Sequence, residues 1–186
     1  MNVGAAVTVS ITVILALSGY LITYGISLRL ARRKEHLEWV NRQLSEYYGP
    51  LYGLIQASDR IFRDLSSKHS FWGDGERLAT EHETKVWRLW IEHAFMPLNR
   101  RMMEIVIGRA DLLIEDHMPE CLQELCAHVV GYEAMLVRWK EVGSFSPLRH
   151  DNASTPLFPG AALRAYISTS FLLLKKEQEQ LIRRIR

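Results

Sequence analysis

The run formed by residues 1–28 contains no charged side chain, and this feature constrains the fold more than any other. A bilayer core of about 30 Å requires roughly 20 apolar helical residues, so the run is long enough to span it. A cleaved secretory signal would carry bases before its apolar stretch, whereas here the bases follow it. The sequence therefore predicts one transmembrane helix over residues 1–28.

The first charged residues of the chain are all basic, and they follow the apolar run directly: Arg29, Arg32, Arg33 and Lys34. Bases beside a membrane span mark its cytoplasmic end. We therefore expect a basic juxtamembrane segment over residues 29–36, with the amino terminus outside. Residues 29–186 are then expected in the cytoplasm, with the chain held in contact with the lipid bilayer.

Small and hydroxylated residues recur every three or four positions along the apolar run, so they share one helix face. They are Ala5, Thr8, Thr12, Ala16, Gly19, Thr23 and Ser27. Small residues let helix backbones approach closely, which predicts a self-association face and a homo-oligomer. The alternative is a chance pattern, with each hydroxyl bonded to its own helix. A water-filled pore is less favoured, because no ionisable residue lies in the run.

Four later stretches show apolar residues at helical spacing, over residues 37–65, 80–113, 119–141 and from 160 onward. No stretch shows the alternation of a strand. The sequence predicts an all-α fold in which the transmembrane helix continues into an antiparallel four-helix domain over residues 37–186. Kinks are expected at Gly49, Pro50 and Pro97, because proline lacks a backbone N–H.

Catalytic and metal-binding motifs are not found in the sequence. His117, Cys121 and His128 are spaced four and seven apart near one face of a predicted helix, yet Cys121 and His128 flank its apolar stripe and no metal motif is matched, so we interpret them as packing residues. We expect no enzyme activity, no metal and no cofactor. Arg100 and Arg101 are candidates for binding an anionic small molecule or nucleotide; pairing with nearby acids is the favoured alternative.

Three segments carry a resemblance to known proteins: LSEYYGPLYGLI (44–55), VWRLWIEHAFMPLNRRMMEIV (86–106) and, more loosely, CLQELCAHVVGYEAMLVRW (121–139). They resemble a bacterial family of small, uncharacterised single-span proteins with a cytoplasmic helical domain. The architecture is also similar to that of membrane effectors of bacterial anti-phage systems. That resemblance implies a protein that perturbs the inner membrane after a signal.

Two functional hypotheses follow from these features. In the first, the cytoplasmic bundle of an oligomeric effector controls the packing of the transmembrane helices, and so membrane integrity or ion leak. In the second, the span is a passive anchor, and the domain is a docking subunit that recruits a cytosolic protein. Duplex nucleic acid is not an expected partner, because the bases gather beside the apolar run and not across a domain face.

Overall fold

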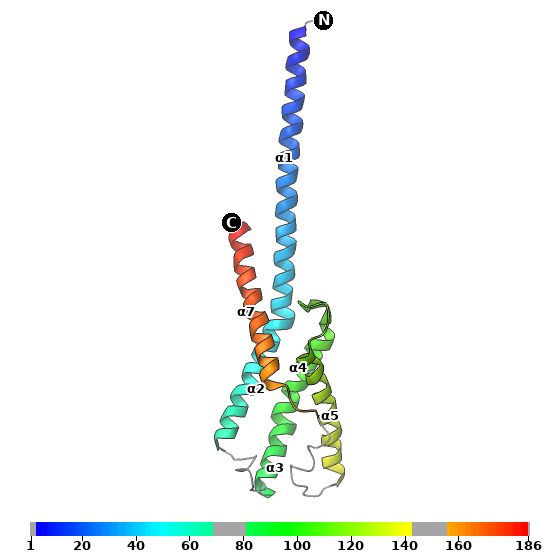
Figure 1. Cartoon of the computed structure of the whole chain (residues 1–186), viewed down its shortest axis with the longest axis vertical. Helices are drawn as coiled ribbons and strands as arrows, with labels where there is room; N and C mark the ends of the chain where they lie inside the picture. The colour runs from blue at the N-terminus through cyan, green and yellow to red at the C-terminus, as the bar shows by residue number, and fades with distance from the viewer. Residues whose placement is uncertain (1–2, 69–80, 143–155, 186) are drawn as a thin grey trace. The chain divides into compact units, whose positions relative to one another are not determined.

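The structure is a computed structural model that describes residues 3–68, 81–142 and 156–185 (Figure 1). Within these ranges the side chains of residues 3–14, 141–142 and 185 lie outside the description. All regular secondary structure in the described ranges is helical, and no strand occurs there. The predicted all-α class is therefore confirmed.

The chain divides into two compact units. Unit 1 comprises Met1–Asn41 and Lys176–Arg186, and unit 2 comprises Arg42–Lys175. Helix α1 (Val3–Arg42) and helix α7 (Gly160–Ile185) each contribute residues to both units.

In unit 1 the end of α7 runs antiparallel to α1. The Arg33 guanidinium donates from Nη1 to the Arg184 carbonyl over 3.2 Å, and Gln178 Nε2 donates to Asn41 Oδ1 over 2.7 Å. His36 Nε2 and Glu177 Oε1 also lie 2.8 Å apart. The earlier residue of α1, Arg33, meets the later part of α7, and Asn41 meets an earlier part, so the two helices are antiparallel.

Helix α1 presents large apolar side chains to its surroundings. From Leu15 to Leu28 every large hydrophobic side chain is exposed. Among the residues whose side chains are described, which in α1 begin at Leu15, no helix is long and apolar enough to cross a membrane.

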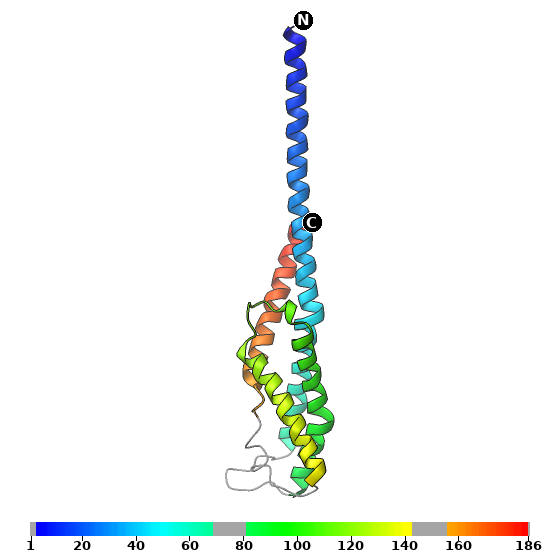
Figure 2. The same cartoon turned by 90° about the vertical axis from the view of Figure 1, so that its right-hand side faces the viewer.

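Unit 2 is built from α2 (Gly49–Lys68), α3 (Glu81–Trp90), α4 (Met96–Gly108), α5 (Glu120–Val142) and the first part of α7. A short 3₁₀ turn, η3 (Ala110–Leu112), follows α4. Figures 1 and 2 show α2, α4, α5 and α7 running alternately down and up, and α4 packs against both α2 and α5. The fully buried side chains include Tyr47, Tyr48, Leu51, Met102, Leu122, Leu125 and Ile167.

Two π-helical segments, η1 (Gln43–Tyr48) and η2 (Ile91–Phe95), precede the two helix prolines. The N–H of Gly49 donates to the Leu44 carbonyl, and the N–H of Met96 donates to the Ile91 carbonyl, five residues back in each case. Pro50 and Pro97 follow directly. A proline cannot bond four residues back, and a wider turn accommodates it without ending the helix. The helical path therefore runs unbroken from Val3 to Lys68.

The extra residue of a π turn also shifts which side chains face the core. The regular spacing places Ala94 and Leu98 on the apolar stripe, but both are only half-buried. Phe95, Met96 and Asn99 are buried in their place, with exposed fractions of 7%, 1% and 4%. The predicted stripe is thus wrong at Ala94 and Leu98, where the periodicity assumes 3.6 residues in every turn, whereas its later members Met102 and Ile105 are buried as predicted.

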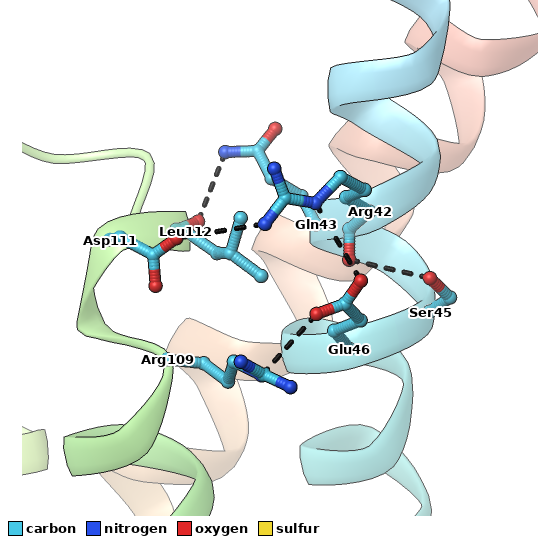
Figure 3. Close-up of polar contacts among 7 residues, drawn as sticks. All are labelled: Arg42, Gln43, Ser45, Glu46, Arg109, Asp111 and Leu112. Atoms are coloured by element: carbon cyan, nitrogen blue, oxygen red, sulfur yellow. Dashed lines mark hydrogen bonds and ion pairs between the residues drawn. The ribbon is translucent and has the colours of Figure 1, made fainter.

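Polar contacts bind η1 to the turn that follows α4 (Figure 3). The buried Gln43 side chain donates to the Leu112 carbonyl over 3.0 Å. Glu46 accepts ion pairs from Arg42 at 3.6 Å and from Arg109 at 3.3 Å. These contacts satisfy polar groups at the point where the helix widens.

A second polar chain joins η1 to α7. Tyr166 Oη donates to Glu115 Oε2 over 2.7 Å, and the hydroxyls of Tyr48 and Tyr166 lie 3.0 Å apart. The Ile114 N–H donates to Tyr48 Oη over 3.1 Å. Because each hydroxyl both accepts and donates, Tyr48 and Tyr166 cross the apolar core as one continuous chain of hydrogen bonds.

The close approach at Gly49 gives a stability prediction. A Cβ added to Gly49 would lie 2.3 Å from the Leu44 carbonyl oxygen, whereas one added to the exposed Gly53 meets nothing within 4 Å. Gly49→Ala should lower the free energy of unfolding by about 1–3 kcal/mol. The control Gly53→Ala should raise it by about 0.5–1 kcal/mol. Urea unfolding followed by circular dichroism measures both, and equal effects would contradict a tight π turn.

Candidate functional site

The predicted association face is described only in its second half. Ala16, Gly19, Thr23 and Ser27 are exposed, while the side chains of Ala5, Thr8 and Thr12 lie outside the described residues. Thr23 Oγ1 donates to the Gly19 carbonyl over 2.9 Å, so this hydroxyl is bonded within its own helix. Nothing lies within 4 Å of a Cβ built on Gly19, which leaves room there for the backbone of another helix.

Unit 1 brings together basic residues from two distant parts of the sequence. Arg29, Arg32, Arg33 and Lys34 are exposed on α1, and Arg183 and Arg184 are exposed near the end of α7. The hydrogen bond from Arg33 to the Arg184 carbonyl sets the two groups side by side. We call these six residues the basic helix pair. The first four were predicted as a topology signal, but their pairing with α7 was not.

The two candidate anion-binding arginines have separate partners. Arg100 Nε lies 2.8 Å from Glu133 Oε1 on α5, and Arg101 Nη1 lies 2.9 Å from Glu104 Oε2 on its own helix. The structure does not direct the two guanidinium groups to one point. Each arginine is instead paired with a nearby acid, which is the alternative that the sequence analysis favoured over anion binding.

The residues considered as metal ligands are not gathered into one site. His117 is exposed, whereas Cys121 is a buried free thiol whose pKa is raised by burial. His128 is also buried. Among the described residues, no three His, Cys, Asp or Glu side chains lie close enough to hold a metal ion.

A cavity of about 400 Å³ opens within unit 2, a size typical of small-molecule sites. Its walls come from α2, α3, η2, α4, α5 and the segment leading into α7. In one lining cluster Trp87 and Phe95 have ring centroids 5.8 Å apart, and Phe62 lies within 6.5 Å of both. In a second cluster the His128 ring lies 4.5 Å from Tyr132 and 5.3 Å from Phe158. The cavity is thus lined by two aromatic clusters.

Few polar groups line this aromatic cavity. His128 Nδ1 donates to the Pro156 carbonyl over 2.8 Å, and burial lowers the pKa of the imidazole. Arg164 donates from Nη2 to Asp59 Oδ1 over 2.7 Å and pairs with the same carboxylate through Nε. Asn99 Oδ1 is buried and has no hydrogen-bond partner in the part of the chain that the structure describes.

The sequence contained little sign of this cavity. Asn99 is off the regular stripe and reaches the wall only because η2 shifts the register. Ser58 is the exception, since a serine on a regular apolar stripe is itself a signal, and it is buried on the cavity wall. The remaining walls depend on contacts between residues far apart in the chain.

Comparison with protein-family models, curated proteins and solved structures gives no match to this chain. Its function is therefore inferred from its own residues and their geometry.

His128 should make stability depend on pH. Because burial lowers the pKa of this imidazole, the unfolded chain binds the proton more readily than the folded chain. Stability from this group is therefore present above the unfolded pKa of about 6.5 and is lost as the pH falls below it. The slope for one proton is at most about 1.4 kcal/mol per pH unit.

The substitutions His128→Gln and His128→Phe should both remove this part of the pH dependence. Each should also lower the free energy of unfolding at neutral pH by about 1 kcal/mol, through loss of the bond to Pro156. Urea unfolding between pH 7.5 and 5 measures the difference from the unmodified chain. Parallel stability curves for all three proteins would show that His128 titrates alike in the folded and unfolded states.

Proposed function

We propose that this chain is a single-span, oligomeric effector of the bacterial inner membrane. In this proposal residues 1–28 cross the bilayer with the amino terminus outside, and unit 2 lies in the cytoplasm. The observation that carries the proposal is helix α1, whose uncharged segment from Leu15 to Leu28 exposes every large apolar side chain.

The distribution of those side chains favours lipid over a protein partner. At about 100° per residue, Leu15, Leu17, Leu21, Ile22 and Ile26 cover about half of the helix circumference, and the exposed small-residue stripe from Ala16 to Ser27 covers the other half. Each of these large apolar side chains is more than half exposed. A partner helix would cover one face only, whereas lipid surrounds a helix completely. The uncharged part of α1, residues 3–28, would be about 39 Å long, enough to cross a bilayer core of about 30 Å.

The basic helix pair supports the same placement. It begins where the uncharged run ends, and α7 adds Arg183 and Arg184 to the four bases of α1. No acid occurs in residues 29–34 or 180–186. Bases at a membrane surface attract anionic lipid headgroups by about 1 kcal/mol each. Two antiparallel helices would thus supply one basic surface at the cytoplasmic interface.

The effector role depends on association of the spans. The exposed stripe from Ala16 to Ser27 leaves space for a second backbone at Gly19. The unbroken helical path from Val3 to Lys68 offers a direct connection between the spans and the bundle. A change in bundle packing would re-pack the spans and open a leak, with flexing at Gly49–Pro50 and Pro97. An anti-phage trigger fits this mechanism.

The second candidate is a membrane tether that recruits a cytosolic partner without changing membrane permeability. It is favoured by the bond from Thr23 Oγ1 to the Gly19 carbonyl, because a hydroxyl bonded within its own helix contributes less to association.

Membrane insertion is tested by charges placed near the middle of the run. Leu15→Arg with Leu17→Arg should cost about 2.5–3.5 kcal/mol per substitution and move the protein from the carbonate-washed membrane pellet to the supernatant. The control Leu172→Arg with Leu173→Arg, at exposed positions of α7, should stay in the pellet. If both double variants remain in the pellet, the proposed span is wrong.

The effector and tether roles are separated by matched changes inside the span. Gly19→Leu with Thr23→Leu blocks the stripe, and Gly25→Leu with Ser18→Leu makes similar changes off it. The stripe variant should lose oligomers by crosslinking, and its toxicity and membrane depolarisation should fall by about tenfold, a loss of roughly 1.4 kcal/mol of association. The off-stripe variant should resemble the unmodified chain.

A third protein, with residues 3–28 replaced by polyleucine, completes the comparison. A tether should keep its function with this span, whereas an effector should lose it. An unchanged oligomer, toxicity and membrane potential in both the stripe variant and the polyleucine protein would rule out the effector role.

A further inference from the structure

The charged groups around the cavity of unit 2 leave it without net charge. Asp59 and Arg164 are both on its lining and are paired with each other. His128 donates from Nδ1 to a backbone carbonyl, and its burial favours the neutral ring. A charged ligand would need an uncompensated opposite charge in the lining, and the described lining residues supply none.

The shape and chemistry of the walls suit flat rings. Phe62, Trp87 and Phe95 form one aromatic cluster, and His128, Tyr132 and Phe158 form the other. Rings between such walls gain stacked and edge-to-face contacts in addition to burial of apolar area. Leu157, also on the lining, is 85% exposed, so an occupant would cover an apolar side chain that is now in contact with water.

One side chain of the cavity wall has a polar atom without a partner among the described residues. Asn99 lines the cavity and is only 4% exposed, and its Oδ1 accepts no hydrogen bond from residues 3–68, 81–142 or 156–185. A buried carbonyl oxygen without a donor costs about 1–3 kcal/mol, so native proteins rarely keep one without a reason. A ligand that brings an O–H or N–H group to Asn99 would remove that cost.

We infer that this cavity binds an uncharged aromatic small molecule that carries one hydrogen-bond donor, with Asn99 Oδ1 as the acceptor. Phe62, Trp87 and Phe95 contact its rings from one cluster, and Tyr132 and Phe158 from the other. The site lies wholly in unit 2 and is independent of the proposed membrane span.

Three probes with the same two-ring skeleton test the chemistry. 2-Naphthol has a donor and no charge, 2-methoxynaphthalene lacks the donor, and naphthalene-2-sulfonate is an anion. Each is titrated into the full-length protein by calorimetry, with the protein-free buffer as the blank. 2-Naphthol should bind about tenfold more tightly than its methyl ether, the value of one well-placed hydrogen bond. The sulfonate should bind more weakly than either.

Two matched variants test the location. Ala161 is exposed and lines the cavity, whereas its neighbour Ala162 is exposed and does not. Ala161→Trp should lower 2-naphthol affinity at least tenfold, because the larger side chain fills the space, and Ala162→Trp should leave it unchanged. Neither change removes a buried side chain, so both proteins should fold.

Asn99→Leu tests the acceptor. This variant should bind 2-naphthol and its methyl ether equally, because the preference depends on the amide oxygen. Equal binding of 2-naphthol by the Ala161→Trp and Ala162→Trp proteins would overturn the site. A preference for the sulfonate, or absence of 2-naphthol binding to the unmodified chain, would overturn the ligand class.

Discussion

The missing N–H of proline is the constraint on which the fold of unit 2 depends. Pro50 and Pro97 each follow a turn closed by a bond five residues back, at Gly49 and at Met96. The wider turn removes the clash that would end an α-helix, and it adds one residue to the register. Glycine is needed at the first turn because the Leu44 carbonyl occupies the space of a Cβ.

The shifted register determines what lines the cavity. With regular turns, Ala94 and Leu98 would face inward; with η2 in place, Phe95 and Asn99 do so. Phe95 completes an aromatic cluster. Asn99 brings a buried amide whose oxygen has no hydrogen-bond partner among the described residues. π turns often occur at functional sites because the extra residue redirects a side chain. The cavity wall and the accommodation of Pro97 thus have one structural cause.

Unit 1 is organised by a different contrast, between an uncharged helix segment and a basic one. The apolar side chains of α1 are exposed as far as Leu28, and the bases begin at Arg29. The bond from Arg33 to the Arg184 carbonyl adds the end of α7 to that basic surface. Lipid chains would surround the uncharged segment of α1, and anionic lipid headgroups would attract the basic helix pair. That match, together with the space at Gly19, is the basis of the proposed effector.

The sequence by itself determined the helical class and the starts of two helices, because periodicity, glycine and proline act through neighbouring residues, whereas the helix expected to reach residue 113 ends at Gly108. Helices expected from 119 and from 160 begin at Glu120 and Gly160. The uncharged run and its flanking bases are likewise sequence properties, and the membrane span deduced from them stays a prediction. Only the tertiary structure decided that Asn99 is buried, that Arg33 meets Arg184 and that two aromatic clusters face one cavity. A π turn has no strong local signature, and contacts between distant residues depend on the whole packed chain, so neither follows from a periodic pattern.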